Sequence, residues 1–335
     1  MLPRVSIVVR SMARASLDEA LASIGMQDYE RIEAVIVAAC GAAHPAPPGA
    51  IGNHRVRFVA GETPRSRPQA ANAGLDAATG DWITFLDDDD VMLPGHLSGL
   101  VAAQRNAPHC NVVYTLARAR FADGTTQPVG QPFAPIELFE RNFIQLSMAL
   151  FSRELLVQGC RFDESLDILQ DWDFFIQCAQ HTRFHFEPRQ TFEWRAEAGD
   201  SGAGAGTNQD DARFAALRDR IYAKWDARRD SLVERVGGDL QRADALAKAA
   251  DYAGAEAICR DVLDFSQNDP FALNLLAMVQ RAAGRIDDAR TTQTLACAVR
   301  PQDASLARNL ALLNRTAGGA IANSKPGESA HAQST

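Results

Sequence analysis

Four consecutive aspartates, Asp87 to Asp90, are the residues of this sequence whose type and spacing most clearly suggest chemistry. They directly follow the apolar segment 82–86, which reads as a buried strand. Open α/β sheets bind their ligands at the carboxyl ends of strands, where this run falls. Four negative charges there cost free energy unless a cation offsets them, and oxygen ligands at this density suit Mg²⁺ or Mn²⁺ bridging to substrate phosphates. A solvated acidic turn is the alternative, but a run that abuts a buried strand is not a free surface loop.

Alternating strands and helices surround this run and must position it. Short β-branched and aromatic segments predict strands, and Ser16 with Glu19 offers a capping box that opens the first helix. The expected strands are 5–9, 35–37, 55–59, 82–86, 111–114 and 184–186, and the expected helices are 20–27, 69–78, 97–104 and 171–180. Stretches at 41–53 and 124–135 predict loops. Near-continuous apolar strands that alternate with helices indicate an α/β fold with a largely parallel sheet.

The composition is that of an ordinary folded protein. The 335 residues are 46% hydrophobic and 23% charged, and their number predicts two domains. The net charge of −8 argues against a nucleic-acid surface, whose footprint would be basic. Six cysteines without a CxxC pair or Cys/His cluster argue against zinc and redox motifs. Neither a signal-peptide layout nor a run of about 20 apolar residues occurs, so we expect a cytoplasmic protein with free thiols.

The last third of the sequence has a different pattern of hydrophobic residues. After a Gly-rich patch at 199–206, which reads as a linker or as a loop that orders on a ligand, continuous helical periodicity begins. Ala255 and Ala289 lie 34 residues apart, and Ala289 and Pro301 keep the spacing of the second helix of a tetratricopeptide unit. A plain pair of helical hairpins is the alternative, because small-residue spacing is degenerate. The residues beyond Gly318 have the composition of a disordered tail.

Three patterns occur in order and together cover about the first 200 residues. A strand, helix and strand occupy 5–37, and N-x-G-x(5)-G-(D/E)-(F/W/Y)-I-x-F-L-D-x-D-D runs from Asn72 to Asp90. The segments Gly159-Cys-Arg-Phe-Asp-Glu164 and Gln170-Asp-Trp-Asp173 follow. With this ordered set the sequence resembles the inverting nucleotide-sugar glycosyltransferases of family 2, which have the GT-A fold. The resemblance implies transfer of a sugar from a nucleoside diphosphate to an acceptor hydroxyl, with inversion at the anomeric carbon.

The resemblance assigns residues to the sugar donor. A diphosphate departs with developing negative charge, so a divalent cation held by Asp89 and Asp87 would act as a Lewis acid. Guanidinium forks suit phosphate oxygens, which favours Arg65 and Arg67 as nucleotide contacts, although a basic loop for solubility is an equal alternative for either one alone. The expected contacts of the nucleotide sugar are Ser11, Arg14, Arg65, Arg67, Asn72, Asp87 and Asp88.

The acceptor hydroxyl must lose its proton as it attacks, and one carboxylate suffices for that. By resemblance this general base is Asp171, with Trp172, Asp173 and Arg195 on the acceptor side. An ordinary helix N-cap is the alternative for Asp171. The helix dipole would depress the pKa of Asp171 and weaken it as a base.

Three segments depart from the family's pattern. The first strand ends Arg10-Ser-Met-Ala-Arg14, where the family usually has a Pro-Thr-Tyr-Asn type of turn. The second strand ends Ala38-Ala-Cys-Gly41, without the carboxylate that binds the nucleotide base, so base recognition must be altered or rely on backbone groups. The Tyr-Arg-x-His pattern becomes Trp194-Arg-Ala-Glu197, in which Glu197 is either an oxygen ligand of the metal or a surface residue.

These features predict a GT-A glycosyltransferase domain over 1–207, a helical tetratricopeptide-like domain over 208–318 and a disordered tail over 319–335. The expected enzyme uses Mg²⁺ or Mn²⁺ and a UDP-, GDP- or dTDP-linked sugar. Its acceptor would be a glycan, a lipid-linked molecule or a protein, in the building of surface polysaccharide or a glycoconjugate. The helical domain would bind a protein partner or form a homodimer, and the enzyme would be cytoplasmic or peripheral at the inner face of the membrane.

Two rival hypotheses remain. The first is a catalytically weakened sugar-nucleotide-binding protein that acts through its helical module. The missing carboxylate near Ala38 favours it, whereas Asp87 to Asp90 and Asp171 oppose it. The second is a nucleotidyltransferase, which would bring a Gly-rich phosphate loop near the N-terminus, but the segment from Arg10 to Ser16 contains no glycine.

Overall fold

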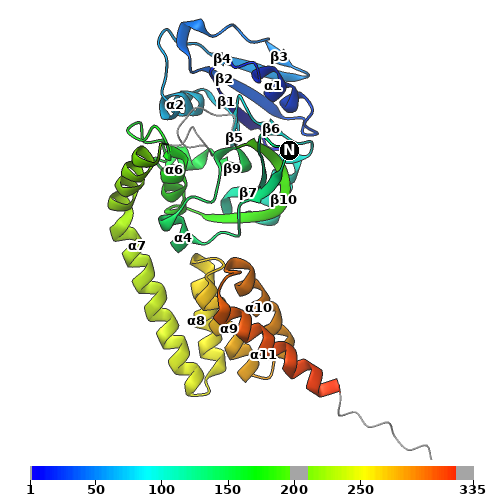
Figure 1. Cartoon of the computed structure of the whole chain (residues 1–335), viewed down its shortest axis with the longest axis vertical. Helices are drawn as coiled ribbons and strands as arrows, with labels where there is room; N and C mark the ends of the chain where they lie inside the picture. The colour runs from blue at the N-terminus through cyan, green and yellow to red at the C-terminus, as the bar shows by residue number, and fades with distance from the viewer. Residues whose placement is uncertain (1, 197–209, 322–335) are drawn as a thin grey trace, which may run out of the picture. The chain divides into compact units, whose positions relative to one another are not determined.

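The computed structural model of the chain describes residues 2–196 and 210–321 (Figure 1). The chain divides into two compact units, Met1–Arg229 and Asp230–Thr335, and the division falls inside the long helix α7 (Asp211–Lys248). The sequence places a domain boundary earlier, between residues 207 and 208. The Gly-rich patch at 199–206 lies outside the described residues. So does the expected tail at 319–335, apart from its first three residues, which end α11 (Ala304–Ile321).

The N-terminal unit is built on one ten-stranded sheet with the order β3-β4-β2-β1-β5-β9-β7-β10-β6 and with β8 beside β7. Its strands are β1 (Val5–Ser11), β2 (Ile32–Ala38), β3 (Ala50–Ile51), β4 (His54–Val59), β5 (Trp82–Asp87), β6 (Val91–Met92), β7 (Cys110–Arg120), β8 (Thr126–Val129), β9 (Ala149–Ser152) and β10 (Arg183–Arg195). Every residue of β1 and of β2 is buried, so these strands form the centre of the core.

The predicted α/β class is confirmed, but the sheet is mixed and not largely parallel. Strands β4, β2, β1 and β5 run parallel to one another, as do β7 and β10. Strand β9 is antiparallel to both β5 and β7, and β8 forms a hairpin with β7 inside the segment that was expected to be a loop. A hairpin needs only a tight turn, whereas parallel neighbours need a long crossover, and the apolar pattern of a strand does not reveal which connection follows it.

Helices cover the sheet where the sequence pattern predicts them, with small shifts of their ends. Helix α2 packs on β1, β2 and β4, and α3 packs on β7, β9 and β10. The helices and 3₁₀ turns of this unit are α1 (Leu17–Gly25), η1 (Gly41–Ala43), α2 (Arg67–Ala77), α3 (His96–Asn106), α4 (Pro135–Glu140), η2 (Leu146–Met148), α5 (Glu154–Val157) and α6 (Gln170–Ala179), followed by the start of α7.

A capping box opens α2, whereas the one predicted for α1 is wrong. The side chain of Ser66 accepts a hydrogen bond from the Gln69 N–H, and the Gln69 side chain accepts one from the Ser66 N–H. Ser16 instead has helical backbone angles, with φ −73° and ψ −13°, and its side chain makes no capping bond. An N-cap residue needs extended backbone to aim its oxygen at the first turn. The box at Ser66 therefore fixes Arg67 as the first residue of α2.

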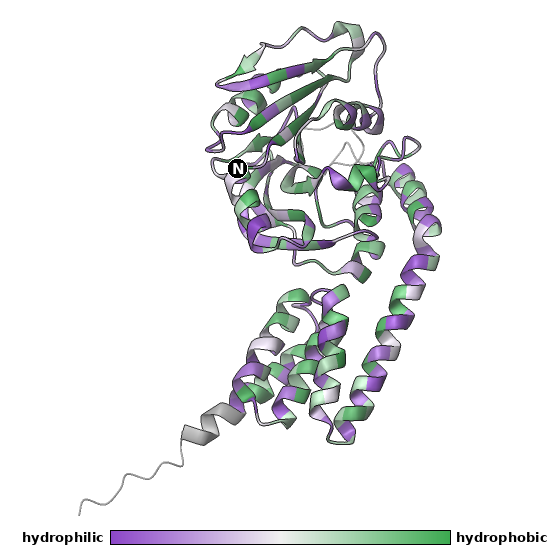
Figure 2. Cartoon of the chain, turned by 180° about the vertical axis from the view of Figure 1, so that it is seen from behind, coloured by the Kyte–Doolittle hydropathy of each residue, from purple (hydrophilic) through white to green (hydrophobic). Residues whose placement is uncertain are grey.

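The C-terminal unit is helical, as predicted. It contains the end of α7, α8 (Tyr252–Phe265), α9 (Pro270–Ala282), α10 (Ile286–Val299) and α11, and each of α8 to α10 packs on the next helix of the chain. Figure 2 shows hydrophobic and hydrophilic residues alternating along these helices, as amphipathic helices require. Leu273, Ala296, Val299 and Leu306 form one buried cluster. Among the described residues, none of the helices has the length and apolar character of a membrane span.

Gly74, in the pattern that begins at Asn72, lets α2 lie directly on β1. A Cβ atom at position 74 would lie 2.2 Å from Val8 Cγ1 and 3.3 Å from Val37 Cγ2. Overpacking of a core costs about 1–3 kcal/mol, so we expect Gly74→Ala to lower the free energy of unfolding by about that amount, measured by urea denaturation. Gly49→Ala is the control, because a Cβ there meets nothing within 4 Å. Equal stabilities of the two variants would contradict the prediction.

Candidate active site

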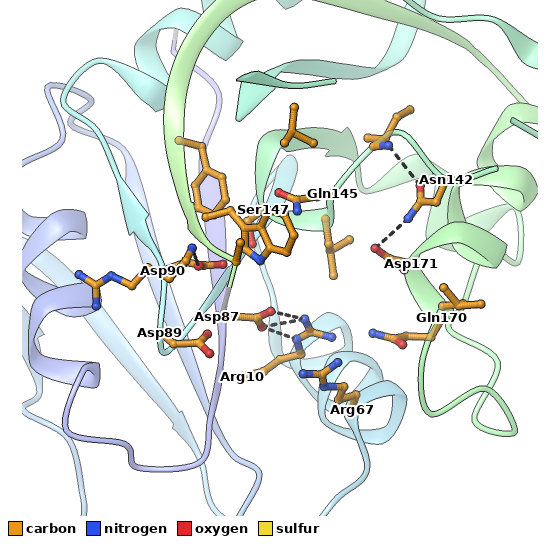
Figure 3. Close-up of a pocket in the computed structure, with 18 of the residues that line it drawn as sticks. Arg10, Arg67, Asp87, Asp89, Asp90, Asn142, Gln145, Ser147, Gln170 and Asp171 are labelled. Carbon is orange, nitrogen blue, oxygen red and sulfur yellow. Dashed lines mark hydrogen bonds and ion pairs between the residues drawn. The ribbon is translucent and has the colours of Figure 1, made fainter. Parts of the chain in front are cut away.

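The site begins where β1 and β5 end side by side. Arg10 and Asp87 are partners in the parallel register of these strands, although 77 residues separate them. Arg10 Nε donates to Asp87 Oδ1 at 2.9 Å, and Arg10 Nη2 donates to Oδ1 at 2.7 Å and to Oδ2 at 2.8 Å (Figure 3). The guanidinium also lies over the Phe85 ring, 5.7 Å from its centroid. Both oxygens of Asp87 are therefore held by one rigid fork.

Asp88 faces the turn after β1. Its side chain is fully buried, and its Oδ2 accepts from Met12 N at 2.6 Å and from Ser11 Oγ at 3.2 Å. Its Oδ1 accepts from Arg14 Nη1 at 2.5 Å. Ser11 Oγ also lies 2.8 Å from His44 Nε2. Ser11 and Asp88 thus bond to each other and close this turn, and they do not line either of the cavities described below.

Asp87, Asp89 and Asp90 form an all-oxygen cluster. One carboxylate oxygen of each lies within 4.8 Å of those of the other two. Burial and the charge of Asp87 raise the pKa of Asp89, and burial with the charges of Asp87 and Asp89 raises that of Asp90 well above its ordinary value. Burial acts in the same direction on Asp87, but Arg10 and Arg67 outweigh it and lower the pKa of that carboxyl. A cation would offset the repulsion at Asp89 and Asp90, and three oxygens suit Mg²⁺ or Mn²⁺.

Two cavities meet beside this cluster. The smaller has a volume of about 180 Å³ and is lined by four arginines, which are Arg10, Arg14, Arg65 and Arg67. The larger has a volume of about 360 Å³ and extends to α6, the loop before β9 and the end of β10. Four residues line both cavities, and these are Arg10, Arg67, Asp87 and Asp89.

Asp171 lies on the far wall of the larger cavity. Helix α6 begins at Gln170, and its N-cap is Leu169 in the left-handed region with φ 61°, so Asp171 belongs to the first turn and is not the N-cap. Asp171 Oδ1 accepts from Trp172 N at 2.9 Å, and Oδ2 accepts from Asn142 Nδ2 at 3.1 Å. Burial raises the pKa of Asp171, whereas these hydrogen bonds and the charge of Arg10 lower it, and the net shift is upward. The expected depression by the helix dipole is wrong, because burial has the larger effect.

Besides Ser11 and Asp88, three more expected site residues do not line either cavity. Asn72 Nδ2 donates to Phe162 O at 3.0 Å, and its Oδ1 accepts from Phe162 N at 3.1 Å, so this amide holds the loop before α6. Trp172 is buried and donates from Nε1 to Leu138 O. Asp173 is fully buried and accepts from Trp225 Nε1 at 2.8 Å and from Lys224 Nζ at 2.9 Å, which attaches the start of α7 to α6.

Arg195 does line the larger cavity, where its backbone N–H donates to Asp90 Oδ1 at 2.9 Å and its side chain pairs with Glu19 at 2.6 Å. The end of β10 therefore donates a hydrogen bond to the aspartate cluster and also forms one wall of the larger cavity. Glu197, the possible oxygen ligand, lies outside the described residues.

Several cavity residues were not foreseen from the sequence. Within the described chain, Gln145 Oε1, Gln170 Oε1 and Arg10 Nη1 are buried in the larger cavity's lining without a hydrogen-bond partner. Buried polar atoms are rarely left unpaired, and a polar ligand in this cavity would supply the partners that these three atoms lack. Arg10 belongs to the segment 10–14 at the end of the first predicted strand, and Gln170 belongs to the motif at 170–173. The loop with Asn142 and Gln145 carries no periodicity or motif that could have identified it.

Comparison with known proteins places this site in context. Residues 6–160 match the family model Glycosyl transferase family 2. A succinoglycan biosynthesis protein, ExoO of Rhizobium meliloti, is 34% identical over 51% of this chain and 54% of its own length. An uncharacterized glycosyltransferase of Haemophilus influenzae is 25% identical over 54% of this chain and 63% of its own length. The chain thus spans less than two thirds of either relative.

Among solved structures, S. aureus TarS 1-349 in complex with UDP-GlcNAc is 17% identical, with a TM-score of 0.49 over 86% of this chain and 90% of that chain.

The aspartate cluster predicts that Mn²⁺ stabilises the folded chain. A ligand that binds only the folded state at 100 times its Kd adds about 2.7 kcal/mol of stability, which thermal unfolding detects as a raised midpoint. We expect Asp89→Asn to remove most of this shift, since the substitution deletes one anionic ligand. Asp76→Asn is the matched control, because Asp76 is exposed and lines neither cavity. An Mn²⁺ shift of full size in Asp89→Asn would contradict the assignment.

Proposed function

We propose that this chain, of which residues 6–160 match the family model Glycosyl transferase family 2, transfers a sugar from a nucleoside diphosphate to an acceptor hydroxyl with inversion. The observation that carries the proposal is that Asp171 and the cluster of Asp87, Asp89 and Asp90 line one cavity from different walls (Figure 3). Direct displacement needs one group that accepts the proton of the attacking hydroxyl and another that stabilises the departing diphosphate. A single cavity brings both groups to one reacting carbon.

The smaller cavity is proposed to bind the nucleotide diphosphate. Arg14, Arg65 and Arg67 line it, and guanidinium groups match phosphate oxygens in shape and charge. Burial lowers the pKa of Arg67, but the neighbouring charges of Asp87, Asp171 and Asp89 favour its protonated form. Asp87, Asp89 and Asp90 are proposed to hold Mg²⁺ or Mn²⁺, which when bound would supply Lewis acidity toward the departing phosphate.

The larger cavity is proposed to hold the transferred sugar and the acceptor hydroxyl. Asp171 would take the proton of that hydroxyl, and its raised pKa makes it a stronger base than an ordinary aspartate. Asn142 holds the carboxylate in place through its bond to Oδ2. The unpaired oxygens of Gln145 and Gln170 can accept hydrogen bonds from sugar hydroxyls. The displacement proceeds without a covalent enzyme intermediate.

Recognition of the nucleotide base is proposed to use backbone groups and Arg65. At the end of β2, Arg65 Nη1 donates to Ala38 O at 3.0 Å, and Arg65 N donates to Ala39 O at 2.8 Å. Arg65 thus lies at the end of β2, the strand whose last residues lack the carboxylate of the family's pattern. The relative ExoO is named for succinoglycan biosynthesis, which supports a role for this chain in building a polysaccharide on a glycan or lipid-linked acceptor. The helical module, proposed to be tetratricopeptide-like, would recruit a partner or a second copy.

The function is tested by screening UDP-, GDP- and dTDP-sugars with Mn²⁺, first for a raised unfolding midpoint and then for release of the nucleoside diphosphate. We expect Asp171→Asn to lower kcat by about 10²–10⁴-fold while the donor still binds, because a general base contributes that much to the rate. Asp123→Asn is the control, since Asp123 is exposed in the turn between β7 and β8. Donor binding without turnover in the unaltered chain would favour the catalytically weakened binding protein instead.

Asp171 also predicts a pH dependence. A general base acts in its ionised form, so kcat/KM falls as the pH drops through the pKa of Asp171, which burial places above the ordinary value of 3.8. The bond from Asn142 stabilises the ionised form, so its loss raises this pKa further. We therefore expect Asn142→Ala to move the acid limb of kcat/KM to higher pH. A limb that stays in place or moves to lower pH would argue against Asp171 as the base.

A further inference from the structure

We propose that Arg10 is a catalytic residue, which donates a hydrogen bond from Nη1 to the terminal phosphate of the departing nucleoside diphosphate. This inference rests on the proposed function and adds a residue to it. Arg10 lies at the end of β1, in the segment 10–14 where the sequence departs from the family's pattern. Its pair with Asp87 uses Nε and Nη2 and leaves Nη1 without a role.

Neighbouring groups bind or cover the guanidinium of Arg10 in a way that leaves only Nη1 without a hydrogen-bond partner among the described residues. Arg10 is 9% exposed, its Nε and Nη2 are bound to Asp87, and its guanidinium plane lies over Phe85. Nη1 is buried and makes no hydrogen bond within the described part of the chain. A buried donor without a partner is costly, and more so on a charged group. An anionic oxygen from a ligand is the partner that both the charge and the geometry favour.

The position of Arg10 indicates which oxygen that is. Arg10 lines both cavities and so stands at their junction, with Arg14 and Arg65 on the smaller side and Asp171 on the larger side. If the diphosphate fills the smaller cavity and the sugar the larger, the bond that breaks lies at this junction. The electron pair of that carbon–oxygen bond stays on the terminal phosphate, as the acceptor oxygen bonds to the carbon and its proton moves to Asp171. A fixed donor aimed at this developing charge needs no reorganisation during the reaction.

Arg10 also sets the charge of the aspartate cluster. Its fork neutralises Asp87, so the cluster presents less negative charge to a cation than three free carboxylates would. Without Arg10, Asp87 would repel Asp89 and Asp90 more strongly, and a divalent cation would relieve more repulsion on binding. Removal of Arg10 should therefore tighten cation binding and at the same time weaken binding of the diphosphate.

The test compares the full chain with Arg10→Gln and Arg10→Lys by calorimetry, using UDP against UMP and GDP against GMP, with and without Mn²⁺, and Mn²⁺ alone. For Arg10→Gln we expect about tenfold or more loss of affinity for the diphosphate, little change for the monophosphate, and tighter Mn²⁺ binding. We expect kcat to fall by about 10²-fold or more. Arg10→Lys should recover only part of this loss, since one amine cannot both hold Asp87 and reach the phosphate.

The controls separate the possible failures. Arg57→Gln breaks the Arg57–Glu33 pair outside both cavities and should match the unaltered chain, and unfolding midpoints report whether each variant folds. Equal losses for UDP and UMP with weaker Mn²⁺ binding would overturn the inference in favour of a supporting role. An unchanged preference for diphosphates in both variants would also overturn it. If the unaltered chain binds neither these four nucleotides nor dTDP, the proposed function itself fails.

Discussion

The site depends on one constraint, which is the electrostatic cost of four consecutive carboxylates at the carboxyl end of the buried strand β5. The fold meets this cost by giving each aspartate a different environment. Asp87 pairs with Arg10. Asp88 accepts hydrogen bonds from the Met12 N–H and from Arg14, both of which follow β1. Asp89 and Asp90 are left with raised pKa values, because burial and their neighbours oppose ionisation. The repulsion that remains is concentrated where a cation could relieve it.

The wall of the larger cavity that carries Asp171 is held in place by residues that do not line the cavity. Trp172 and Asp173 directly follow Asp171, and they anchor α6 to α4 and to the start of α7. Leu169 precedes the helix in a left-handed conformation, which is uncommon for a residue with a branched side chain. Such backbone strain persists only where the surrounding structure fixes it, and here it falls directly before the turn of α6 that carries Asp171. The motif thus combines one carboxylate that lines the larger cavity with neighbours that hold its helix in position.

The two departures from the family's pattern at the ends of β1 and β2 meet in the smaller cavity. Arg10 comes from the first and Ala39 from the second, and both line this cavity with Arg65, whose Nη1 donates to Ala38 O at the end of β2. A carboxylate is missing at the end of β2 and a guanidinium is gained at the end of β1, so both changes make this cavity more positive. That shift fits an anionic ligand.

The sequence by itself determined the α/β class, the order of most strands and helices, the aspartate run and the carboxylate at the start of α6. These are properties of neighbouring residues, because periodicity, apolar runs and turn chemistry act over a few positions. Only the tertiary structure decided that Asp90 joins Asp87 and Asp89, that Asp88 faces away, and that Asn72, Trp172 and Asp173 stabilise the scaffold. It also decided that Arg10 meets Asp87 and that an unmarked loop supplies Asn142. The register of distant strands and the burial that sets each charge depend on the whole packed sheet, so no local pattern contains them.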